Sequence, residues 1–296
     1  MRRGLGYTLR QEGRMLASFV EYMERRGITR LTLQAALGWA TEPAHASPTW
    51  WAKRLSVVRG FASYLQSVDE DTEVPPKGLL ASGPSRRTPY LFSPAQIAAL
   101  MAAARGLACP LRAATFETLI GLMAITGLRT GEAMALDRAD VDLAEGMLTV
   151  WRSKLSKSRQ LPLHESTVAA LARYAARRDE LCPAPATPGF LLSGAGTRLN
   201  HTNTSKTFAG LLEDAGIAAP PGRRRPRPYD LRHGFAVATL ISWHAEGAKV
   251  QSRLPVLSTW MGHVKPASTY WYLQAAPELM GLAASRLERY LQGGRP

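Results

Sequence analysis

The sequence predicts a mainly α-helical protein with one small β-hairpin, arranged as two domains. Three observations support this fold class. Apolar residues recur at helical spacing along most of the 296 residues, a stretch rich in proline, glycine and arginine interrupts them near residue 80, and two short apolar runs flank a charged loop near residue 155. With 46% hydrophobic residues, a chain of this length can bury a core without disulfide bonds.

Residues 1–78 predict a small helical domain. A helix is expected from residue 9 to about residue 26, where apolar residues share one face and Gly27 ends the pattern. A short helix is expected over Leu33–Trp39. A third begins with Ser47 as its N-cap and Pro48 at the first helical position.

Three basic residues of this third helix fall off its apolar stripe. They are Lys53, Arg54 and Arg59, and in that position they can face phosphate groups. Lys53 and Arg54 are therefore expected DNA contacts if the partner is DNA. Solvated helix charge is the commoner explanation for such residues, and both interpretations remain open.

Residues 79–92 are expected to form a basic linker, because breakers and basic residues dominate the stretch from Val74 to Pro89. A second domain, residues 93–296, opens with Ser93-Pro94-Ala95-Gln96, a capping box with proline at the first helical position. Within it, Met147–Val150 and Gln160–Leu163 flank the basic loop Arg152–Arg159, which predicts a β-hairpin with a charged tip. Further helices are expected over residues 166–178, 203–215, 230–244 and 277–291. The last is amphipathic, and contact with a second protomer and packing on its own domain are both open.

The charge balance favours a polyanionic partner. Lysine and arginine number 37 against 23 acidic residues, so the formal net charge is +14. Nucleic acid is the leading candidate, because neutralising phosphates releases condensed counterions. A solvated basic surface is the alternative.

Cysteine usage and hydropathy predict a cytoplasmic protein without a membrane partner, and a DNA partner would make it nucleoid-associated. Cys109 and Cys182 lack metal-ligand spacing and are expected to be ordinary apolar residues of a reducing compartment. Polar residues follow the basic N-terminus at once, so no signal peptide is expected. The most apolar stretch, Leu119–Leu128, is too short to span a bilayer.

Four motifs in the second domain carry residues suited to chemistry at a phosphodiester. In the first, Thr126-Gly127-Leu128-Arg129-Thr130-Gly131-Glu132, an arginine at a helical turn can present its planar fork to a phosphate. An ion pair between Arg129 and Glu132 that only locks the turn is the alternative. In the second, the hairpin tip carries Lys154, whose ammonium group can donate a proton to a departing sugar oxygen. A charge cluster that protects the sheet edge is the alternative.

The third motif is Tyr229-Asp230-Leu231-Arg232-His233, in which Arg232 lies at the start of a helix and can grip a phosphate. A run of arginines interleaved with prolines precedes it and is expected to contact the DNA backbone generally. This run consists of Arg223, Arg224, Arg225 and Arg227.

The fourth motif is Met261-Gly262-His263, followed by Tyr270-Trp271-Tyr272. Histidine after glycine at a helix end can donate to a nonbridging oxygen, and a tyrosine hydroxyl shortly downstream can act as a nucleophile. Packing is the commoner role of such an aromatic cluster. Each of the four motifs is a weak signal alone.

Taken in order, the motifs resemble the catalytic series of the tyrosine recombinase/integrase family. The interval from His263 to Tyr272 (272 − 263 = 9 positions) matches the family pattern, and so does the hairpin with Lys157 and Arg159 before Leu161-Pro162-Leu163. The resemblance covers about residues 93–275 and implies a catalytic series of Arg129, Lys154, Arg232, His263 and Tyr272.

The resemblance implies a helical core-binding domain followed by an α+β catalytic domain. It also implies a site-specific recombinase in which Tyr272 forms a 3′-phosphotyrosyl link and Lys154 acts as general acid on the 5′-oxygen. The implied partners are double-stranded DNA and either a homo-tetramer on synapsed DNA or a hetero-assembly with related recombinases. No nucleotide cofactor is needed for rejoining, and no carboxylate cluster in the sequence proposes a metal.

The implied role is integration, excision or transposition of a mobile element. Residues 268–273 with 277–280 also resemble recombinases of transposon-like elements that encode several such enzymes in a row.

One position departs from the family pattern, because Tyr229 stands where the family usually has histidine or lysine. A phenol can donate one hydrogen bond to a phosphate oxygen but cannot carry a positive charge. Tyr229 and His233 are expected phosphate contacts. A catalytically weak or inactive DNA-binding accessory protein of the same fold remains an alternative, and a type IB-like topoisomerase is a second rival.

Overall fold

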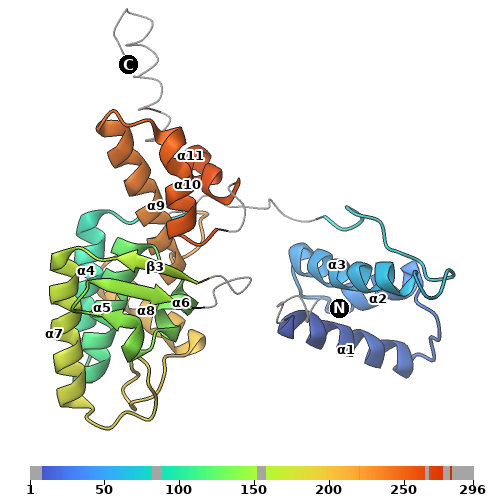
Figure 1. Cartoon of the computed structure of the whole chain (residues 1–296). Coiled ribbons are helices and arrows are strands. Elements are labelled where there is room, and N and C mark those ends of the chain that lie inside the picture. Colours follow the sequence, from blue (N-terminus) through green and yellow to red (C-terminus); the bar gives the residue numbers. More distant parts are fainter. Residues whose placement is uncertain are drawn as a thin grey trace, which may run out of the picture. The chain divides into compact units, whose positions relative to one another are not determined.

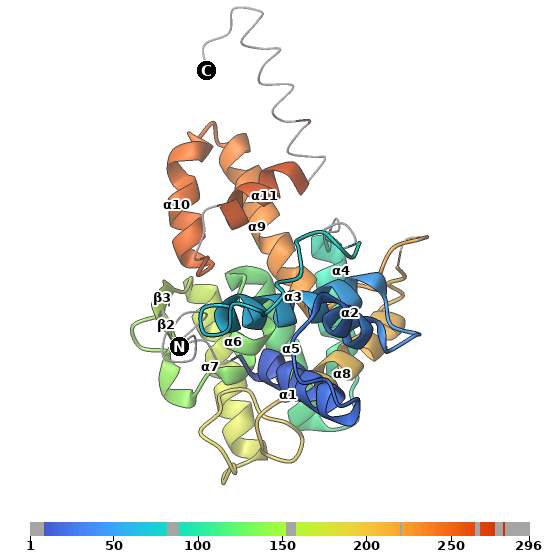
Figure 2. The same ribbon diagram turned by 90° about the vertical axis from the view of Figure 1, so that its right-hand side faces the viewer.

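The computed structural model describes residues 9–81, 89–151, 158–219, 221–263, 267–275 and 281. The chain divides into two compact units, residues 1–87 and residues 88–296, called unit 1 and unit 2 below. Figures 1 and 2 show the elements of each unit from two directions.

Unit 1 is helical in the part that the structure describes. Its helices are α1 (Arg10–Arg25), α2 (Leu33–Thr41) and α3 (Pro48–Leu65). The side chain of Thr32 accepts a hydrogen bond from the backbone N–H of Ala35, and the side chain of Ser47 accepts one from Trp50. These two caps satisfy N–H groups that have no partner within the helix, and they fix the residues at which α2 and α3 begin.

The core of unit 1 lies between its three helices. Phe19 of α1 and Trp39 of α2 meet edge to face with 5.3 Å between ring centroids, and Leu55 and Val58 of α3 are buried in the same cluster. Arg54 is also buried. Its guanidinium carbon lies 3.8 Å from the Trp39 ring centre, and Nη2 donates to the Trp39 carbonyl at 2.5 Å. The expectation that Arg54 lies off the buried face of α3 is therefore wrong, because its planar head stacks on a tryptophan ring.

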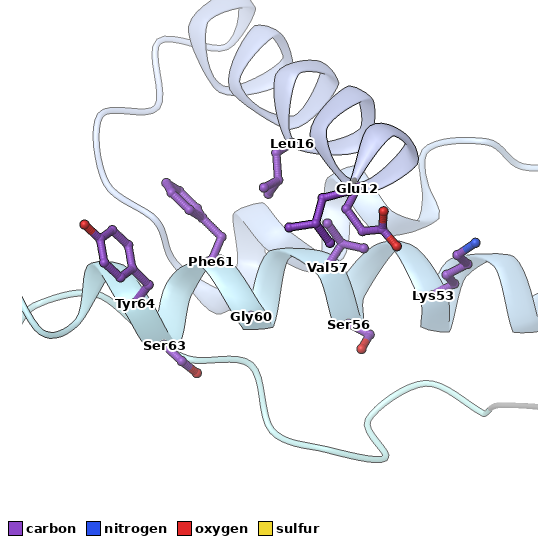
Figure 3. Close-up of a pocket in the computed structure, with 10 residues that line it drawn as sticks. Glu12, Leu16, Lys53, Ser56, Val57, Gly60, Phe61, Ser63 and Tyr64 are labelled. Atoms are coloured by element: carbon purple, nitrogen blue, oxygen red, sulfur yellow. The ribbon is translucent and has the colours of Figure 1, made fainter. Parts of the chain in front are cut away.

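A groove of about 860 Å³ runs between α1 and α3. Figure 3 shows Glu12 and Leu16 of α1, and Val57 and Phe61 of α3, pointing into the space between the two helices. Lys53 lies at one end of this groove.

Unit 2 contains a three-stranded antiparallel sheet. Its strands lie in the order β1 (Val141–Asp142), β2 (Met147–Val150) and β3 (Arg159–Pro162). Leu148 of β2 pairs with Val141 on one side and with Leu161 on the other. The predicted hairpin is confirmed as β2 and β3. β1 was not predicted from the sequence, because a strand of two residues is too short to show an alternating pattern.

The described helices of unit 2 form two groups. The first group is α4 (Pro94–Arg105), α5 (Pro110–Thr126), α6 (Thr130–Ala135), α7 (Glu165–Leu181) and α8 (His201–Asp214), and a short 3₁₀ turn spans Arg138–Asp140. The second group is α9 (Pro228–Ala245), α10 (Val250–Trp260) and α11 (Ala267–Ala275). In Figure 1 the second group lies above the sheet, and α5 packs against α4, α7 and α9.

The predicted fold class, mainly α-helical with a small sheet, is confirmed. Helix ends differ from the predicted ones by a few residues, as for α8, because terminal turns are set by caps such as Asn200, whose side chain accepts from Asn203. The predicted helix over residues 277–291 lies outside the described residues. Within the described ranges, no helix combines the length and the apolar character needed to cross a bilayer.

Candidate active site

The turn between α5 and α6 places Arg129. Gly127 ends α5 with φ +64°, and a Cβ added there would lie 2.4 Å from Cδ1 of Phe235. Both the left-handed backbone and the close ring favour glycine. Arg129 follows as the N-cap of α6, and its backbone N–H donates to Oε2 of Glu132 at 3.0 Å. Its Nη1 donates to Oε1 of the same carboxylate at 2.5 Å, so the predicted pair of Arg129 and Glu132 is present.

Arg232 of α9 is fully buried. Its Nη1 donates to the carbonyl of Gly127 at 2.5 Å, and its Nη2 lies 2.6 Å from the carbonyl of Met261 and 3.0 Å from Nε2 of His263. Among the described residues, Nε of Arg232 has no hydrogen-bond partner. Burial, and next the positive charge of Arg129, lower the pKa of Arg232 from its ordinary value. An unpaired buried donor on one guanidinium group, with the positive charge of Arg129 nearby, is suited to an anion.

The C-terminal end of α10 binds three arginines through three successive carbonyls. Arg159 Nε donates to the carbonyl of Trp260 at 2.6 Å, Arg232 Nη2 donates to that of Met261, and Arg129 Nη2 donates to that of Gly262 at 2.8 Å. The last carbonyls of a helix carry partial negative charge, which favours cations there. This turn therefore gathers guanidinium groups from α6, β3 and α9 at one place.

Arg159 contributes a second contact to this cluster. Its Nη1 and Nη2 donate to Oε1 and Oε2 of Glu132 at 3.2 and 2.8 Å, and the two side chains are 8% and 9% exposed. Burial raises the pKa of Glu132, but the hydrogen bonds and charges of Arg159 and Arg129 outweigh it, so the pKa is lower than its ordinary value. Glu132 therefore stays ionised between two cations.

His263 follows α10 and faces both α9 and α11. An arginine N–H can only donate, so Nε2 of His263 accepts from Arg232, and Nδ1, 2.8 Å from Oγ1 of Thr269, carries the proton of the neutral ring. The ring also stacks on that of Tyr272, with 6.1 Å between centroids and 17° between planes.

Tyr272 of α11 lies in the same cluster and is 2% exposed. Its hydroxyl oxygen is 3.1 Å from Nδ1 of His233, and the Trp271 ring lies beside both rings. Tyr229 precedes His233 by one turn of α9, and their rings meet edge to face with 4.9 Å between centroids. The structure thus brings together Arg129, Arg232, His263, Tyr272 and His233 from four separate segments of unit 2.

The remaining predicted residues divide by exposure. Lys53 is exposed, and its Nζ donates to Oε1 of Gln11 at 2.7 Å, whereas Arg59 is half-buried and donates to the carbonyl of Pro75 at 2.9 Å. The arginines of the proline-rich run are all exposed: Arg223, Arg224, Arg225 and Arg227. Lys154 and Lys157 lie outside the described residues.

Arg159 was expected in the charged loop as a DNA contact, but the structure places it at the start of β3 with its side chain in the arginine cluster. The sequence does hold a signal for this placement. Arg159 and the buried Leu161 are two positions apart, and residues at that spacing point to the same face of a strand. Among the described residues, no group of three or more His, Cys, Asp or Glu side chains is arranged to hold a metal ion.

Comparisons with known proteins identify the family. A family model described as the phage integrase family matches residues 91–278, which is more than half of the chain. The chain therefore belongs to the phage integrase family, the tyrosine recombinases.

Relatives and solved structures agree with this assignment. "Putative integrase/recombinase y4rB" of Sinorhizobium fredii is 42% identical over 98% of this chain and 94% of its own length. "Tyrosine recombinase XerD" of Caulobacter vibrioides is 32% identical over 78% of this chain and 72% of its own length.

Among solved structures, the Tn1549 transposon integrase in complex with circular intermediate DNA has a TM-score of 0.67 at 17% identity, covering 97% of this chain and 96% of that one. The XerH site-specific recombinase bound to a palindromic difH substrate has a TM-score of 0.66 at 18% identity, covering 93% and 78%. At identities of 17% and 18%, these structures show only that the chain shares their fold.

Proposed function

We propose that this protein is a site-specific DNA recombinase that cleaves and rejoins DNA through a 3′-phosphotyrosyl intermediate. The observation that carries the proposal is one cluster of contacts: Arg232 binds His263, the His263 ring stacks on that of Tyr272, and Arg129 binds the carbonyl of Gly262, the residue before His263. Phosphoryl transfer depends chiefly on positioning and on neutralising charge at the nonbridging oxygens, and this cluster offers both.

The arginines are proposed to bind the nonbridging oxygens of the scissile phosphate. Arg129 is partly exposed, with 24% of its side chain accessible, and offers the first contact. Arg232 and Tyr272 are both buried, so a phosphate reaches them only after some of the residues that cover them move. Nε of Arg232 is available for the anion without breaking a hydrogen bond among the described residues.

We propose that His233 acts as the general base that accepts the proton of the nucleophile. In the attack, the Tyr272 oxygen forms a bond to phosphorus as the bond from phosphorus to the 5′-oxygen breaks. The phenol proton passes to Nδ1 of His233, which lies 3.1 Å from the hydroxyl, and Lys154 supplies a proton to the departing 5′-oxygen. Rejoining reverses these steps and conserves the phosphodiester energy, so the proposed reaction needs no nucleotide cofactor.

The test is covalent trapping of DNA. Nicked suicide duplexes are tiled across the DNA that flanks the coding sequence, incubated with the protein, and separated by denaturing electrophoresis. We expect a covalent complex with the wild type. Tyr272→Phe is expected to abolish it with no change in DNA affinity, because the ring remains and only the nucleophile is lost.

Tyr270→Phe is the matched control. Tyr270 lies two residues earlier on α11 and is 49% exposed, so its loss is expected to leave trapping unchanged. Trapping that survives in Tyr272→Phe and disappears in Tyr270→Phe would contradict the assignment of the nucleophile.

We propose that exposed basic residues of both units contact the DNA backbone. The candidates are Lys53 of α3 and the arginines of residues 223–227, of which Arg225 is paired with Glu213 and Arg224 has a freely exposed position. Lys154 and Lys157 are included as proposals from the sequence pattern alone.

We also propose that the protein moves a DNA element and acts as a tetramer on two synapsed sites, alone or with related recombinases. The near full-length relative described as an integrase/recombinase supports the first part, and so does the transposon integrase of the same fold, which was solved with circular intermediate DNA. The tetramer rests on the family mechanism, because exchange of strands needs four active sites.

A catalytically weak accessory protein is the second candidate, and Tyr229 favours it. Its ring packs against His233, and a phenol brings no positive charge to the phosphate. Specific DNA binding without any trapped complex in the same experiment would select this function.

A further inference from the structure

We infer that Arg159 is a positioning residue of the phosphate site: it holds Glu132 and the end of α10 together, and through them orients Arg129 and His263. The inference rests on the proposed function. It assigns to Arg159 a role other than direct DNA contact.

The contacts of Arg159 join α6, which begins after Arg129, to the end of α10, which leads into His263. Both of its terminal nitrogens bind the Glu132 carboxylate of α6, which in turn binds the backbone and the side chain of Arg129. Its Nε binds the carbonyl of Trp260, three residues before His263. One planar fork therefore reaches α6 and α10 at the same time.

The fit around Gly262 is close. This glycine has φ +61°, and a Cβ added to it would lie 2.7 Å from Nη1 and 3.1 Å from Cζ of Arg159, and 3.4 Å from Nη1 of Arg129. The turn that leads into His263 thus packs directly against both guanidinium groups. A displaced Arg159 would leave this turn without its support.

The charge pattern supports the same role. Arg129, Arg159 and Arg232 repel one another, and the single negative charge of the ionised Glu132 reduces the repulsion between Arg129 and Arg159 through three side-chain hydrogen bonds. A lysine at position 159 keeps the charge, but its single ammonium group cannot reach both carboxylate oxygens and the Trp260 carbonyl in the same planar geometry.

A purely structural role is the competing explanation, and Arg178 provides the matched control for it. Arg178 of α7 is also a buried arginine, with 5% of its side chain exposed. It donates to the carbonyl of Gly189 at 2.8 Å and pairs with Asp179. None of these partners of Arg178 belongs to the arginine cluster. Arg178→Lys therefore tests what a loss of stability does when the phosphate site is unchanged.

The experiment compares Arg159→Lys with Arg178→Lys in the full chain. Two quantities are measured with the duplex that traps the wild type: the DNA dissociation constant, and the single-turnover rate of covalent complex formation at saturating protein. The third quantity is the melting temperature of each protein variant. The rate is measured with a phosphate and with a methylphosphonate at the scissile position. Methylphosphonate carries no negative charge and so requires less neutralisation by arginine.

We expect Arg159→Lys to slow cleavage of the phosphate substrate by roughly 100-fold, the effect of misplacing a catalytic group by about 1 Å, with an unchanged dissociation constant. The loss on methylphosphonate should be much smaller, since the neutralising arrangement is the part that is damaged. Arg178→Lys should lower the melting temperature and leave both rates, and their ratio, as in the wild type.

Equal behaviour of the two variants would overturn the inference, and so would a loss of the same size on both substrates. If Arg159→Lys does not fold, Glu132→Gln decides instead, because it removes the charge that Arg159 holds, and a wild-type ratio of rates in that variant also overturns the inference. Failure of the wild type to form any covalent complex contradicts the proposed function itself, a different result from either of these.

Discussion

Glu132 shows how one residue can link the stability of unit 2 to pH. Its carboxylate lies between Arg129 and Arg159, which hold its pKa below the ordinary value despite burial. A carboxyl group with a lowered folded-state pKa contributes stability that is present above its unfolded pKa, about 4.3, and is lost as the pH falls through the lower folded value.

We therefore predict that Glu132→Gln destabilises the protein most at neutral pH. The difference in free energy of unfolding between wild type and variant should shrink as the pH falls below about 4.3. Urea unfolding of unit 2 at several pH values measures this difference. Glu145→Gln, at an exposed glutamate of the same unit, is the control and should show no such trend, whereas a constant difference for Glu132→Gln would show that the ion pairs are not its source.

At the residue scale the sequence identified most of the site but not its internal contacts. The resemblance of four weak motifs, taken in order, to the family's catalytic series was the basis for predicting that Arg129, Arg232, His263 and Tyr272 meet. The three carbonyls of residues 260–262 could not be predicted as arginine acceptors, because every residue has the same carbonyl and only the fold selects these three.

At the scale of elements, the junction of α5 and α6 leaves little room for substitution. Gly127 combines a left-handed backbone with a Phe235 ring at the place of its missing Cβ, and its carbonyl binds Arg232. Gly216, which follows α8, has φ +67° but no atom near the position of its missing Cβ. A substitution at Gly216 therefore introduces backbone strain alone, whereas the same substitution at Gly127 introduces backbone strain and crowding.

We predict that Gly127→Ala destabilises the protein more than Gly216→Ala. Both substitutions carry the left-handed strain of about 1–2 kcal/mol. Gly127→Ala adds crowding of about 1–3 kcal/mol, because the Phe235 ring must move. Denaturant unfolding measures both, and equal losses would mean that Phe235 moves aside at no cost.

The elements also show which sequence patterns are informative. The capping box at Ser93 and Gln96 was predicted from residue types and forms both of its hydrogen bonds. The burial of Arg54 was not predictable from periodicity, since a helical pattern treats arginine as polar while the structure uses its flat head to cover Trp39.

At the scale of the whole molecule, the net charge of +14 is carried in part by exposed residues of both units. Lys53 of unit 1 and Arg224 of unit 2 are exposed, whereas Arg54 is buried against Trp39. Counterion release makes DNA affinity fall with salt in proportion to the number of phosphates contacted.

We predict that Lys53→Ala and Arg224→Ala each reduce the slope of log affinity against log salt by about one, and that together they reduce it by about two. Arg54→Gln removes the same formal charge and should lower the melting temperature while leaving the slope unchanged. Fluorescence anisotropy with a duplex over a range of salt concentrations gives the slopes. A reduced slope in Arg54→Gln would contradict the assignment of that residue to the interior.

The turn at residues 260–262 has a consequence for synthesis of the chain. Its three arginine partners precede it by 101, 29 and 133 residues, so each contact closes a long loop. A nascent chain that has not yet emerged as far as residue 262 has its guanidinium groups but not the acceptors that align them, and Tyr272 follows later still. Under the proposed function, an unfinished chain therefore lacks the assembled arginine cluster and its nucleophile, and we expect it to be unable to cleave DNA.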